Sequence, residues 1–100
     1  MKTQIRPTTH TAHTATNLYN YINNAHQVEN LELQIKSKEK DIQAHKDLQN
    51  IYKKMGCMNM LEASEERCSA IELEILVLRL KRNKLEEQMI KFEIATFLED

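Results

Sequence analysis

The chain has 100 residues, of which 41% are hydrophobic and 29% are charged, and its formal net charge is −1. This length allows one domain, and 24 Leu, Ile, Val and Phe residues make the chain too apolar for complete disorder. One Gly, one Pro and five aromatic residues argue against sandwiches, barrels and doubly wound sheets, which need frequent turn residues. No apolar run approaches a bilayer-spanning length, and the amino-terminal region lacks the apolar segment of a secretory signal. We therefore expect an all-α, cytoplasmic chain.

Residues 1–16 differ in composition from the rest of the chain. They contain six Thr, no acidic residue and one large aliphatic residue, Ile5. Such a segment buries too little apolar area to offset the entropy lost on ordering. The sequence therefore predicts a flexible Thr-rich arm over 1–16, followed by an α-helical hairpin over 17–100.

The hairpin is predicted from a single break in otherwise helical sequence. Residues 17–55 are rich in helix-forming side chains, and Gly56 can end that helix in the left-handed conformation. Asn59 precedes Glu62 at the spacing of a capping box, which predicts a turn over 56–59 and a second helix over 60–98. Two helices of similar length joined by a short turn fold back on each other as an antiparallel pair.

Apolar residues at spacings of three and four predict the seam between the helices. Folding the chain about position 57 pairs residues whose numbers sum to about 114, so Ile22 is expected near Phe92 and Ile35 near Leu78 or Arg79. In the second helix the main polar interruption of the seam is Arg82. The predicted seam consists of Ile22, Ala25, Leu31, Ile35, Ile42, Ile71, Ile75, Leu78, Leu85, Met89 and Phe92.

The segment 71–80 is apolar on more than one side. Its alternating pattern is compatible with a strand, but the helical sequence on both sides of it, without a breaker, favours a helix. A helix would place some of its aliphatic residues opposite the seam, where a two-helix hairpin cannot cover them. A second chain could cover them, most simply in a symmetric dimer that forms a four-helix bundle, and a different protein is the alternative. The predicted partner face consists of Leu73, Val77, Leu80, Ile94 and Leu98.

Candidate catalytic and metal-binding residues are few. The register brings His45 near Cys68, but no Gly-rich turn offers an oxyanion site and no third group orients the imidazole, so we expect no enzymatic activity and no cofactor. Cys57 lies on the predicted turn. His10 and His13 form an HxxH pair that supplies too few ligands for zinc, unless a symmetry mate completes the site.

Basic residues gather near the middle of the predicted hairpin. A belt of this kind could bind phosphates or an acidic protein surface, which makes a nucleic-acid-associated protein the alternative function. Nearby Glu39 and Asp41 dilute the belt, and the net charge is slightly negative, so charges paired along a solvated face are favoured instead. The belt consists of Lys36, Lys38, Lys40, Arg79, Lys81, Arg82 and Lys84.

Small size, the absence of a predicted pocket and the surplus of outward aliphatic residues favour a non-enzymatic protein–protein interaction module. We expect an oligomerising hairpin, with a dimer favoured, that serves as an adaptor, an assembly factor or a small inhibitor of a larger protein machine. Small helical proteins encoded by phages and mobile elements provide an analogy at the level of size and shape only.

Overall fold

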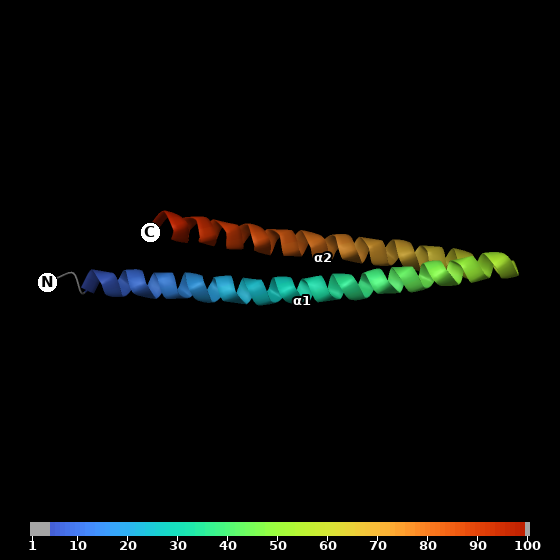
Figure 1. Cartoon of the computed structure of the whole chain (residues 1–100), viewed down its shortest axis with the longest axis horizontal. Coiled ribbons are helices and arrows are strands. Elements are labelled where there is room, and N and C mark those ends of the chain that lie inside the picture. The colour runs from blue at the N-terminus through green and yellow to red at the C-terminus, as the bar shows by residue number, and fades with distance from the viewer. Residues whose placement is uncertain (1–4, 100) are drawn as a thin grey trace.

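The structure, a computed structural model, describes residues 5–99, and it describes side chains from residue 15 to residue 98. Two helices, α1 (Ile5–Met55) and α2 (Met58–Glu99), make up this part of the chain. They run antiparallel, side by side, and form a rod of 83 × 18 × 14 Å with both termini at one end (Figure 1). The all-α hairpin is confirmed, and the segment 71–80 is helical rather than a strand.

The first helix starts earlier than its composition predicts. α1 begins at Ile5, so residues 5–16 are helical and the expected boundary at residue 17 is wrong. Thr has a lower helix propensity than Ala by well under 1 kcal/mol per residue, which disfavours a helix without breaking it. Pro7 lies in the first turn, where its missing N–H leaves no intrahelical bond unmade. Residues 1–4 of the predicted arm lie outside the described residues.

The connection between the helices is a Schellman turn at Gly56. The Gly56 N–H donates to Lys53 O over 3.3 Å, and the Cys57 N–H donates to Tyr52 O over 2.9 Å. Gly56 has φ 73°, the left-handed conformation that this motif requires. Cys57 is the N-cap of α2, because its carbonyl accepts the first helical bond, from the Leu61 N–H. The second helix therefore begins at Met58, and the predicted capping box at Asn59 does not form the start of the helix.

Replacing Gly56 by Ala is expected to destabilise the hairpin by about 1–2 kcal/mol. A Cβ at this position would meet no atom within 4 Å, so the cost arises from the left-handed backbone alone. Urea unfolding followed by circular dichroism measures the effect. Gly56→Asn is the matched control, because Asn adopts this conformation more readily than Ala and should lose less stability. Equal losses for the two variants would contradict the backbone explanation.

The core is a single seam along the hairpin. Its central cluster consists of Ile35, Ile71, Ile75 and Leu78, with the half-buried Leu31 and Ile42 against it. Lys38 contacts Glu74, and Gln49 contacts Ser64, so contacting residues have numbers that sum to about 113. This agrees with the predicted register to within about one residue.

One predicted seam residue is replaced by its neighbour. Ile22 is 48% exposed, and Tyr21 takes its place against Phe92, with ring centroids 4.9 Å apart. The Tyr21 hydroxyl donates a hydrogen bond to Glu93 Oε2, and this bond is the main cause that raises the pKa of Tyr21 above its usual value. Tyr can bury its ring and keep its hydroxyl at the surface, an option that Ile lacks. The other ten predicted seam residues are buried or half-buried: Ala25, Leu31, Ile35, Ile42, Ile71, Ile75, Leu78, Leu85, Met89 and Phe92.

Candidate interaction face

The outward side of α2 carries a second heptad stripe. Its positions follow one another at spacings of three and four, the pattern by which one helix packs against another. Every side chain in it is exposed, and the six apolar ones are 53–71% exposed. We call this set the outward stripe; it consists of Leu73, Leu76, Leu80, Asn83, Glu87, Ile90, Ile94 and Phe97.

Helix geometry separates the outward stripe from the seam. Residues two apart on a helix point about 200° apart, so Leu73 faces away from the hairpin while Ile71 and Ile75 face α1. Accordingly, Ile71 is 2% exposed and Leu73 is 64% exposed. None of the side chains that the structure describes, from residue 15 to residue 98, covers this side of α2.

The structure exposes all five residues of the predicted partner face, and it extends the set. Leu73, Leu80 and Ile94 belong to the outward stripe, and Val77 and Leu98 lie along its edge at 50% and 79% exposure. The prediction missed three apolar stripe residues: Leu76, Ile90 and Phe97. The signal that could have found them is the unbroken alternation of three and four from Leu73 to Phe97.

Two polar residues interrupt the outward stripe at its centre, Asn83 and Glu87. Arg82 donates to Asn83 Oδ1 from Nε, over 3.4 Å, and from Nη2, over 3.3 Å. The amide oxygen of Asn83 is therefore engaged within α2. Among the described residues, its amide nitrogen has no hydrogen-bond partner, and Glu87 forms no ion pair.

A layer of polar side chains lies in the seam near the turn. Ser64 is 7% exposed, and its Oγ lies 3.0 Å from His45 Nδ1 and 3.3 Å from Gln49 Nε2. Gln49 Nε2 donates to this Oγ, and the Ser64 hydroxyl also lies within donating distance, 3.4 Å, of the backbone oxygen of His45. We call His45, Gln49 and Ser64 the polar layer; within it every buried side-chain polar atom has a partner.

The structure does not pair His45 with Cys68. Cys68 is buried, and its Sγ lies 3.4 Å from Gln49 Nε2 and 4.0 Å from Ile42 O. The imidazole of His45 instead contacts Ser64. Cys57, the second free cysteine, is half-buried at the turn. The polar side chains of the seam thus satisfy one another across the helix pair.

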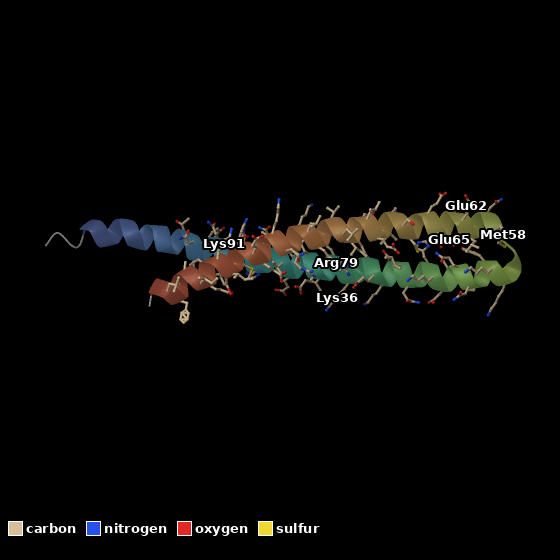
Figure 2. The ribbon with its side chains drawn as sticks, turned by 90° about the horizontal axis from the view of Figure 1, so that it is seen from above. Lys36, Met58, Glu62, Glu65, Arg79 and Lys91 are labelled. Atoms are coloured by element: carbon tan, nitrogen blue, oxygen red, sulfur yellow. The ribbon has the colours of Figure 1, made fainter. Side chains whose placement is uncertain are left out.

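Ion pairs occupy part of the predicted basic belt. Lys38 contacts Glu74 over 2.8 Å, Arg79 contacts Glu39 over 3.0 Å, and Arg82 contacts Glu86 over 3.6 Å. The hydrogen bond from Lys38, followed by its positive charge, lowers the pKa of Glu74. Lys36 and Arg79 lie midway along the hairpin, whereas Glu62 and Glu65 lie near the turn (Figure 2).

The four remaining belt residues, Lys36, Lys40, Lys81 and Lys84, are exposed and form no ion pair among the described residues. Lys81 and Lys84 line an open groove between the helices with Gln27, Gln34 and Gln88. Lys81 and Arg79 are about 200° apart around α2, so the Arg79–Glu39 pair lies on a different side of the hairpin. The seven residues therefore do not form one continuous basic surface.

The described residues hold neither a metal-binding cluster nor a membrane-spanning helix. The described residues contain no group of three or more His, Cys, Asp or Glu side chains placed to hold a metal ion. The side chains of His10 and His13 lie outside those that the structure describes. Neither helix, over its described length, is apolar enough to cross a membrane.

Comparison with known proteins gave no relative: no family model, no curated protein and no solved structure matches this chain.

Proposed function

We propose that this chain is a non-enzymatic protein–protein interaction module, an oligomerising helical hairpin whose outward stripe binds a helix of another polypeptide. The observation that carries the proposal is the exposure of six large apolar side chains in a heptad pattern on one side of α2. Burying a large aliphatic side chain contributes about 1.5–3 kcal/mol, so covering side chains that are 53–71% exposed contributes about 1–2 kcal/mol each. Exposed apolar surface of this extent is typical of interaction sites.

The shape of the hairpin suits a role as adaptor, assembly factor or small inhibitor. The seam and its polar layer pack α2 against α1, so the outward stripe is presented on a preformed helix. A preformed binding helix loses less conformational entropy on association than a segment that must fold first. The alternative, nucleic-acid binding through the basic belt, is less well supported because three of its seven residues are paired with carboxylates.

Substituting Leu73→Glu together with Val77→Glu is expected to abolish binding through this face. Both side chains are at least half exposed, so helicity should be retained while two charges enter the apolar face. Sedimentation should give a monomer mass for the variant. Mass spectrometry identifies the polypeptides that the immobilised wild-type chain retains from an extract of its source cells. The immobilised variant should no longer retain them.

The matched control is Leu33→Glu with Ser37→Glu, which introduces the same charges at the same spacing on exposed positions of α1. This variant should behave as the wild-type chain does. If the α2 variant sediments like the wild type and retains the same polypeptides, the outward stripe is not the binding surface.

A further inference from the structure

We propose that the partner of the outward stripe is the same stripe of a second copy, packed antiparallel about a two-fold axis near residue 85. This inference rests on the proposed function, since it takes the outward stripe as a binding face. It adds the identity of the occupant, its direction and its register.

The spacing of the outward stripe is symmetric about its own centre. Its eight positions run from Leu73 to Phe97 at intervals of 3, 4, 3, 4, 3, 4 and 3 residues. An antiparallel copy therefore aligns with it position by position, as the two strands of an antiparallel coiled coil do. Leu73 then packs on Phe97 of the partner subunit, Leu76 on Ile94 of the partner subunit, and Leu80 on Ile90 of the partner subunit. Every apolar residue of the stripe meets an apolar residue.

The two polar positions also meet each other. In this register Asn83 lies opposite Glu87 of the partner subunit, and the symmetry repeats the pair. Arg82 occupies the Asn83 amide oxygen, which leaves the amide nitrogen as a donor for the partner's Glu87 carboxylate. Each Asn83 amide nitrogen then donates to a Glu87 carboxylate inside the interface, so neither side chain is buried without a hydrogen-bond partner.

A parallel arrangement lacks this complementarity. It would place Glu87 opposite Glu87 of the partner subunit, and two carboxylates facing each other in an apolar interface repel and cannot both stay ionised. It would also pair Asn83 only with its own copy. Charge therefore selects the antiparallel direction.

The edges of the interface are compatible with this register. Arg79 on one copy lies on the same edge as Glu93 of the partner subunit, so opposite charges face each other twice, while Arg79 keeps its pair with Glu39 and Glu93 its bond from Tyr21. The Lys84 side chains of the two copies face each other on one edge, and the Glu86 side chains do so on the other edge. Both positions are solvent-accessible, where the repulsion between like charges costs little. Arg82 already neutralises Glu86 over 3.6 Å.

The two α2 helices lie at the centre of this dimer, and the two α1 helices lie outside them. This arrangement is a flat layer of four helices rather than the closed bundle expected from the sequence.

Opposite charges at residue 83 test the register. Asn83→Lys should keep the dimer, because each Lys meets the partner's Glu87, whereas Asn83→Glu should weaken dimerisation at least tenfold through two carboxylate pairs. Sedimentation equilibrium measures both, and circular dichroism verifies that helicity is unchanged. Equal dissociation of the two variants would contradict the pairing of residue 83 with the partner's Glu87, since a parallel dimer is disrupted by either charge.

Single cysteines at the ends of the stripe test the direction. In a Cys57→Ser background, which leaves only the buried Cys68, Leu73→Cys and Phe97→Cys chains are mixed in a glutathione buffer. An antiparallel dimer yields the mixed disulfide. It yields little disulfide from either chain alone, because identical residues lie about 36 Å apart.

Other outcomes overturn the inference in distinguishable ways. Disulfides that form mainly between two Phe97→Cys chains indicate a parallel dimer, which refutes the register and leaves the interaction module standing. A monomeric wild-type mass refutes the second copy as occupant. In that case the extract comparison with Leu73→Glu and Val77→Glu still decides whether the stripe binds another protein.

Discussion

Replacing Ile35 by Ala is expected to lower the free energy of unfolding by about 2–5 kcal/mol, the range observed when a buried aliphatic side chain is truncated. Ile35 is 5% exposed and belongs to the central cluster with Ile71, Ile75 and Leu78. The loss combines the transfer free energy of the removed methyl and methylene groups with the cost of a cavity between two long helices. Such helices cannot close the gap without shifting the whole seam.

The matched control for Ile35 lies two residues away in the same helix. Leu33 is 60% exposed, so Leu33→Ala should change the unfolding free energy by about 0.5 kcal/mol or less. Urea titration followed by circular dichroism measures both variants at one protein concentration. Similar losses at the two positions would show that the seam is not where the structure places it.

A second large effect is expected in the polar layer. Ser64→Ala removes the hydroxyl that is hydrogen-bonded to His45 Nδ1 and accepts from Gln49 Nε2, and it should lower the free energy of unfolding by about 1–3 kcal/mol. Ser64 is 7% exposed, so water reaches its position poorly. The loss therefore measures polar groups left without partners rather than lost apolar packing.

Replacing all three residues of the polar layer together should not lower the free energy of unfolding, in contrast to Ser64→Ala alone. The triple variant His45→Leu, Gln49→Leu and Ser64→Ala leaves no polar group unpaired, and it should be at least as stable as the wild-type chain. Urea titration of the single and the triple variant makes the comparison. A triple variant less stable than the wild-type chain would contradict this expectation and would mean that the polar layer contributes net stability of its own.

The turn and the register followed from the sequence because one residue determines both. Gly56 is the chain's single glycine, and Lys53 and Lys54 precede it at the helix end, so the position of the turn was strongly indicated. Once the turn is fixed, an antiparallel pair has little freedom to slide. The start of α2 was wrong by two residues because the Cys57 carbonyl accepts the first helical bond, a role that its side chain does not reveal.

The remaining differences come from choices between residues of similar helical position. Tyr21 and Ile22 are adjacent, and hydropathy favours Ile for the seam, whereas the ring of Tyr21 fits Phe92 and its hydroxyl reaches Glu93. His45 lies against Ser64 rather than Cys68 because Gln49, one turn further along α1, takes the position next to the Cys68 sulfur. The start of α1 was predicted too late because Thr disfavours a helix only weakly, so the Thr-rich composition does not determine where the helix begins.

Because all contacts pair residues around a single bend, the length of chain that each contact closes increases steadily along the rod. His45 and Ser64 are separated by 19 residues, whereas Tyr21 and Glu93 are separated by 72. Closing the longer loop from an unfolded chain costs about 1.2 kcal/mol more in entropy. The hydrogen-bonded contacts beside the bend are therefore the least costly ones to form first. They are also directional, so they can align the two halves before the less selective aliphatic contacts further along come together.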